Sequence, residues 1–104
     1  MICTYNANAA SIIGVNAATI FEYIMYFVYQ SKCQRENFFS GKYWTQETKE
    51  ALSKQFFFMS EKEITMSLAT LLYEKFLERA DDANGLSWYS IGKNGERFYI
   101  ETYT

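Results

Sequence analysis

The sequence predicts an α+β fold, mainly α, in which three helices form the core and a C-terminal β-hairpin or three-stranded sheet follows. Apolar residues recur at helical spacing through the first three quarters of the chain. From Phe76 onward they alternate with a period of two. The 104 residues are 49% hydrophobic and include 9 Phe and 9 Tyr, which is enough apolar material for one core. We therefore expect one domain over residues 1–104, with a short irregular segment at residues 1–10.

The first predicted helix runs from Ala17 to about Ser31. Its apolar positions follow a helical period, while Tyr23 and Tyr26 lie on the opposite side. A helix that is apolar nearly all round belongs at the centre of a domain or in a subunit contact. Asn16 is a candidate N-cap, since its side chain can accept a free backbone N–H. Residues 11–15 before it suggest a short strand or a helical turn.

The second predicted helix follows a loop at residues 32–40. Residues 41–44 predict a turn into a short strand, and Thr45 is a suitable N-cap. Behind that cap, one helical face carries Ala51, Leu52, Gln55 and Phe56.

The third predicted helix begins at Ser60. Ser60 and Glu63 have the spacing of a capping box, in which each side chain accepts the other residue's backbone N–H. The apolar residues behind it are Ile64, Leu68, Leu71 and Leu72, at amphipathic spacing. Only a few residues separate this helix from the second one, which is the spacing of a helix-turn-helix.

The last quarter of the chain predicts paired strands. Residues 76–80 and 86–91 flank a turn at residues 81–85 that contains Asn84-Gly85. Asn-Gly favours a hairpin turn because both residues tolerate positive φ. A second turn at residues 92–95 leads to a further predicted strand at residues 98–103.

An ordered series of short segments resembles one known family. These segments are Ser11–Gly14, Tyr23–Tyr26, Gly41–Thr45, Gln55–Ser60 and Trp88-Tyr89. Together they are similar to the N-terminal winged-helix domain of phage and plasmid replisome-organiser proteins, which are replication-initiation proteins related to DnaD. The resemblance implies a winged helix-turn-helix that binds double-stranded DNA, often as a multimer. The chain departs from the family at Phe57, where relatives usually have proline, and in its few third-helix cations.

Within this interpretation the third helix enters the major groove of DNA. Its outward residues are Lys62, Met66, Ala69, Thr70 and Tyr73, with Thr65 at one edge. We expect Lys62, Thr65, Met66 and Thr70 to lie nearest the bases, and Lys42, Arg79, Lys93 and Arg97 to lie near phosphates. The net charge of −2 gives no basic surplus. Asp81 and Asp82 at the hairpin tip repel phosphate.

The alternative is a protein-interaction or dimerisation module without DNA binding, which holds a second copy or a replication-protein partner. Tyr23, Tyr26 and Tyr73 are the candidate self-association residues, because exposed tyrosines are typical of interfaces. The aromatic residues could instead stack single-stranded bases, but stacking sites need interleaved cations. Core packing or self-association fits this sequence better.

Other function classes find little support. The sequence contains no histidine and no Gly-rich phosphate loop, so we expect no enzyme, and we expect no metal or cofactor. Cys3 and Cys33 match no metal spacing and suggest free thiols in a reducing cytoplasm. The apolar stretch at residues 17–29 is too short to span a bilayer. No signal-peptide pattern precedes it, so we expect a cytoplasmic protein without a membrane segment.

Overall fold

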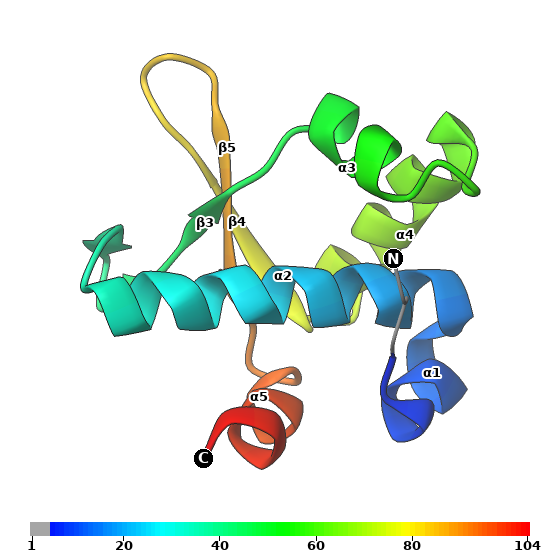
Figure 1. Cartoon of the computed structure of the whole chain (residues 1–104), viewed down its shortest axis with the longest axis horizontal. Coiled ribbons are helices and arrows are strands. Elements are labelled where there is room, and N and C mark those ends of the chain that lie inside the picture. Colours follow the sequence, from blue (N-terminus) through cyan, green and yellow to red (C-terminus); the bar gives the residue numbers. More distant parts are fainter. Residues whose placement is uncertain (1–4) are drawn as a thin grey trace.

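A long central helix, α2 (Val15–Gln34), organises the fold in the computed structural model, which describes residues 5–104. The β4–β5 hairpin projects from one side of α2, and the C-terminal helix lies on the other side (Figure 1). The predicted buried helix is thus confirmed, with nine buried residues along its length. Its N-cap is Gly14, with φ 89°, and not Asn16. Asn16 lies inside the first turn, where its Nδ2 donates to Glu63 Oε2 at 3.2 Å.

The segment before α2 forms a helix that begins earlier than the helical turn considered for residues 11–15. Residues 7–10, expected to be irregular, form the first part of α1 (Ala7–Ile13). Asn6 Oδ1 caps this helix by accepting the amides of Asn8 at 2.8 Å and Ala9 at 3.0 Å. Ala9 and Ile13 are buried against α2, so the short helix is held by packing as well as by its cap.

Three short strands lie between α2 and the next helix. The strands β1 (Phe38–Phe39) and β2 (Lys42–Tyr43) form a small antiparallel pair, and β3 (Thr45–Gln46) follows. Thr45 was expected to cap a helix, and this prediction is wrong, because Thr45 pairs with Tyr89 in a sheet. The cap is Thr48, whose Oγ1 accepts the Ala51 amide at 3.0 Å and begins α3 (Lys49–Gln55).

The predicted capping box is confirmed at the start of α4 (Glu61–Tyr73). Ser60 Oγ accepts the Glu63 amide at 3.1 Å, and Glu63 Oε1 accepts the Ser60 amide at 2.8 Å. Ile64, Leu68 and Leu71 face inward and are buried. Their spacing and the cap together define this helix from local sequence alone.

The predicted hairpin is formed by β4 (Leu77–Asp81) and β5 (Ser87–Ile91). It belongs to an antiparallel three-stranded sheet with the order β3-β5-β4, so the third strand comes from before α3. The strand expected at residues 98–103 is not present. Those residues belong to α5 (Glu96–Tyr103).

The helical conformation of α5 follows from its aromatic contacts. Phe98 is buried and stacks on Phe76 with ring centroids 5.4 Å apart. Five residues later, Tyr103 stacks on Tyr29 of α2 at 4.4 Å. The helical period also brings Tyr99 and Tyr103, four residues apart, onto one face, where their ring centroids lie 5.4 Å apart, whereas a strand would not bring residues four apart into contact.

One hydrophobic core joins these elements. Its buried side chains include Ala9, Ile24, Leu52, Ile64, Leu77, Ile91 and Phe98, which come from all five helices and from both strands of the hairpin. Cys33 is an exposed free thiol, and Cys3 lies outside the described residues. Among residues 5–104, no helix is long and apolar enough to cross a membrane.

Candidate nucleic-acid interface

The solvent-facing side of α4 carries the residues that the sequence placed there. Lys62, Thr65, Met66 and Ala69 are exposed, and Tyr73 at the end of the helix is 84% exposed. Thr70 is only half-buried, and its Oγ1 donates to the Met66 carbonyl at 3.0 Å. The helix thus offers one stripe that contains a cation, a thioether and an aromatic ring.

The junction between α1 and α2 borders this stripe on one side. A shallow hollow of about 400 Å³ between them is lined by residues that include Val15, Glu63, Met66 and Thr70. The Asn16–Glu63 hydrogen bond ties the junction to the first turn of α4. Lys62 is the sole cation of α4 and stands between Glu61 and Glu63. Hydrogen bonds from Ser60 and Asn16 lower the pKa of Glu63, so its carboxylate stays charged.

The hairpin tip is acidic because its two carboxylates build the turn. Asp82 Oδ1 accepts the amides of Asn84 at 2.8 Å and Leu86 at 3.0 Å, and its Oδ2 accepts Trp88 Nε1–H at 3.0 Å. Asp81 Oδ1 accepts Arg79 Nε–H at 3.1 Å and the Ser87 hydroxyl at 3.0 Å. These hydrogen bonds lower the pKa of both carboxyl groups. The tip keeps two negative charges beside one arginine.

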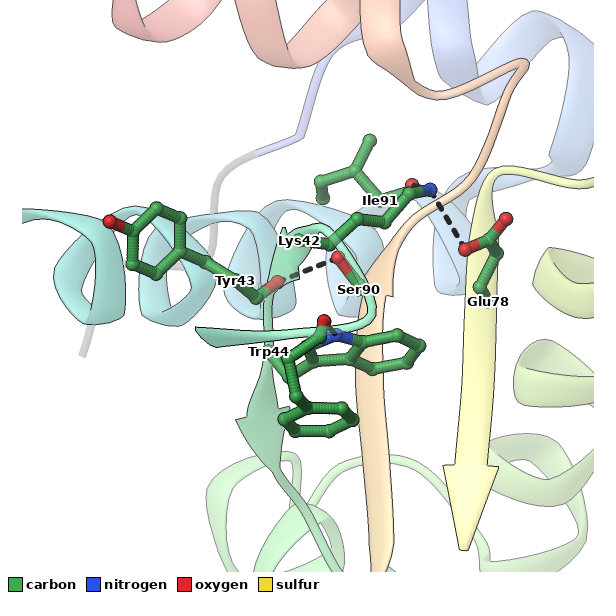
Figure 2. Close-up of polar contacts among 7 residues, drawn as sticks. Lys42, Tyr43, Trp44, Glu78, Ser90 and Ile91 are labelled. Atoms are coloured by element: carbon green, nitrogen blue, oxygen red, sulfur yellow. Dashed lines mark hydrogen bonds and ion pairs between the residues drawn. The ribbon is translucent and has the colours of Figure 1, made fainter. Parts of the chain in front are cut away.

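Lys42, expected near phosphates, lies on β2, and its ammonium group contacts the β4–β5 hairpin. Its Nζ donates to Glu78 Oε2 at 2.8 Å and to the Ile91 carbonyl at 2.9 Å (Figure 2). The β1–β2 pair lies near the C-terminal end of α2, whereas α4 packs beside its N-terminal half (Figure 1). The structure therefore does not bring Lys42 together with the α4 stripe.

The other expected phosphate contacts gather at the base of the hairpin. Arg79 and Lys93 line one hollow together with Lys75, a residue that the sequence analysis did not single out. Lys93 and Arg97 line a neighbouring hollow, and the Arg97 guanidinium lies 4.5 Å from the centre of the Phe98 ring. Lys75 could not have been recognised from sequence, because its position depends on how α4 meets the loop after β5.

The three predicted self-association residues do not form one patch in the ring contacts of residues 5–104. Tyr23 is half-buried and packs against Phe56 at 5.2 Å and Phe27 at 4.8 Å. A continuous chain of ring contacts joins Tyr26, Phe27, Tyr23, Phe56, Phe58 and Phe57, which we call the aromatic strip. Tyr26, Phe58 and Phe57 are its exposed members, and Phe57 is 83% exposed. Tyr73 lies outside the strip.

From the sequence, Phe57 stood out only as a departure from the proline usual in the family, and Phe58 was not expected to be exposed. Their exposure at the turn between α3 and α4 was the missed signal, because three consecutive phenylalanines cannot all face one core.

Comparison with protein-family models, curated proteins and solved structures gave no match.

Proposed function

We propose that the chain is a DNA-binding winged-helix domain, with α4 as the recognition helix and the β4–β5 hairpin as the wing. The observation that carries this proposal is the order helix, strand, helix, helix, hairpin, in which β3 pairs with the far strand of the hairpin. This order leaves the outward stripe of α4 exposed on the surface. A helix needs this exposure to enter the major groove.

Lys62, Thr65 and Met66 are the proposed base contacts. Lysine donates to guanine O6 and N7, threonine bonds to base edges, and apolar groups meet the thymine methyl. Arg79 and Lys93 are the proposed phosphate contacts, while Lys42 is removed from this role because its ammonium group already binds Glu78 and a backbone carbonyl. The resemblance to replisome organisers suggests origin DNA of a phage or plasmid as the target.

Fluorescence anisotropy with labelled duplex DNA tests this proposal. The wild-type chain should bind a duplex, and its affinity should fall at least about tenfold between about 50 and 200 mM salt, because phosphate contacts release counterions. Lys62→Ala should weaken binding by about tenfold. Lys54→Ala, which removes an exposed lysine of α3, is the matched control and should bind like the wild type. Absence of duplex binding at low salt would overturn the proposal.

A second candidate function is self-association through the aromatic strip. Its exposed rings are the kind of surface that interfaces use, and monomeric proteins rarely leave large apolar patches uncovered. Sedimentation velocity should then show a concentration-dependent dimer for the wild type. Phe57→Ser should shift the equilibrium toward monomer, whereas Tyr73→Ser, outside the strip, should not. A wild type that stays monomeric at high micromolar concentration contradicts this candidate.

A further inference from the structure

A hollow at the base of the hairpin gathers three cations from different parts of the chain. Lys75 follows α4, Arg79 lies on β4, and Lys93 lies between β5 and α5. The hollow measures about 640 Å³ and also includes Trp44, Leu72, Leu77 and Glu78 in its lining. We call it the cationic hollow. Three positive side chains in the lining of one hollow favour an anion over a cation there.

The single carboxylate in the lining is already paired. Glu78 Oε2 accepts the Lys42 ammonium at 2.8 Å (Figure 2), so it does not neutralise the three cations. Arg79 pairs with Asp81 only through Nε, which leaves its two terminal amino groups as further donors. Among residues 5–104, Lys75 and Lys93 form no ion pair. The cationic hollow therefore keeps a positive surplus although the whole chain is acidic.

Backbone contacts hold Lys93 close to Lys75. The Gly92 amide donates to the Phe76 carbonyl at 2.8 Å, and the Asn94 amide donates to the Lys75 carbonyl at 2.9 Å. A Cβ on Gly92 would lie 2.3 Å from the Lys75 carbonyl oxygen, so only glycine permits this approach. The backbone positions of the two lysines are thus fixed before any ligand arrives, so binding has to order only their side chains.

We propose that the cationic hollow binds a phosphate group through Lys75, Arg79 and Lys93. Arginine offers a planar set of donors that suits phosphate oxygens, and lysine adds compact charge. The apolar lining from Leu72, Leu77 and Trp44 lowers the local dielectric and strengthens these attractions. The phosphate comes either from a nucleic-acid backbone or from a small phosphate ligand. This inference rests on the phosphate contacts proposed above for Arg79 and Lys93 and adds Lys75 to them. The site does not require α4 to read bases, so it stands if the proposed α4 contacts fail.

Pyrophosphate is the probe for the first experiment, titrated into the full chain at low salt by calorimetry. Tryptophan fluorescence provides a second readout, because Trp44 lines the hollow. The wild type should show saturable binding. Lys93→Gln should weaken it about three- to tenfold, and the double variant Lys75→Asn/Lys93→Gln should abolish it. Asn suits position 75, where φ is 60°. Lys54→Gln on α3 is the matched control.

The outcomes distinguish a nucleic-acid phosphate from a small phosphate ligand, and both from the absence of a binding site. Displacement of pyrophosphate by a thymidine oligonucleotide or a duplex supports the site and identifies a nucleic-acid backbone phosphate as its ligand. Binding of pyrophosphate without displacement supports the site for small phosphates. Absence of saturable binding by the wild type, or equal binding by the double variant and Lys54→Gln, overturns the inference. Circular dichroism and Tm of each variant exclude a loss that comes from unfolding.

Discussion

Glu47 is a buried carboxyl at the point where β3 leads into α3, and it is only 8% exposed. Burial raises its pKa to about 7, because the charged form loses hydration. Burial raises the pKa of the Tyr23 and Tyr89 hydroxyls, and the nearby charge of Glu47 raises the pKa of each ring further. The backbone at this position is fixed to the sheet, since the Glu47 amide donates to the Ser87 carbonyl at 3.2 Å.

The folded chain should lose stability as the pH rises through this titration. The pKa of Glu47 in the folded state, about 7, exceeds the ordinary value of 4.5, so folding favours the protonated form. That stabilisation is complete below about pH 4.5 and is lost as the pH approaches 7. Partial solvent contact limits the loss to about 1–2 kcal/mol. Glu47→Gln should match the wild type at the acidic end and exceed its stability at about pH 8 in urea denaturation.

Glu50→Gln is the control for this measurement, since Glu50 is exposed on the first turn of α3. This variant should show the same change in free energy of unfolding between acidic and basic pH as the wild type. A wild type and a Glu47→Gln variant that keep a constant difference in free energy of unfolding across the pH range would contradict the assignment.

At the scale of elements, the hairpin depends on one acidic side chain. Asp82 accepts three hydrogen bonds, two from turn amides and one from the Trp88 ring. Asp82→Ala should lower the Tm by several degrees and shift tryptophan emission to longer wavelength, because the Trp88 N–H loses its partner. Asp82→Asn keeps an oxygen for the turn amides and should retain most of the Tm. Equal Tm values for the wild type and Asp82→Ala would contradict this role.

The elements that local sequence determines were predictable, and those that depend on distant partners were not. The Ser60–Glu63 capping box and the apolar spacing behind it define α4 within a few residues. In contrast, the local sequence predicts Thr45 as a helix cap, whereas its pairing with Tyr89 of β5 makes it a strand residue. The consecutive apolar residues Phe98, Tyr99 and Ile100 fit a strand as well as a helix, and contact with Phe76 decides between them.

The same division applies to the candidate site. The outward stripe of α4 follows from helical periodicity, so Lys62 and Met66 were placed correctly on the surface. Whether a lysine already has an intramolecular partner depends on tertiary contacts. The partners of Lys42 could not be foreseen, because Glu78 and Ile91 are 36 and 49 residues away in sequence. Lys75 joins the cationic hollow for the same nonlocal reason.

At the scale of the whole molecule, two close backbone approaches join the C-terminal helix to the rest of the fold. A Cβ on Gly92 would lie 2.3 Å from the Lys75 carbonyl oxygen, and one on Gly95 would lie 2.3 Å from the Phe76 carbonyl oxygen. The loop between β5 and α5 therefore lies directly against the link between α4 and β4. Through this contact Phe98 reaches the core beside Phe21 and Phe76.

Gly92→Ala should both lower the stability of the chain and weaken phosphate binding at the cationic hollow. The added methyl group must push the loop away from the Lys75 carbonyl, and this shift strains the Phe98 packing and moves Lys93. We expect a loss of at least about 2 kcal/mol in urea denaturation. Gly41→Ala is the control, because its Cβ meets open space and the cost comes only from φ 75°, about 1 kcal/mol. If Gly92→Ala lowers the free energy of unfolding no more than Gly41→Ala does, the close approach does not hold the β5–α5 loop against the link between α4 and β4. Pyrophosphate affinity should fall for Gly92→Ala alone, since Gly41 lies outside the lining of the hollow.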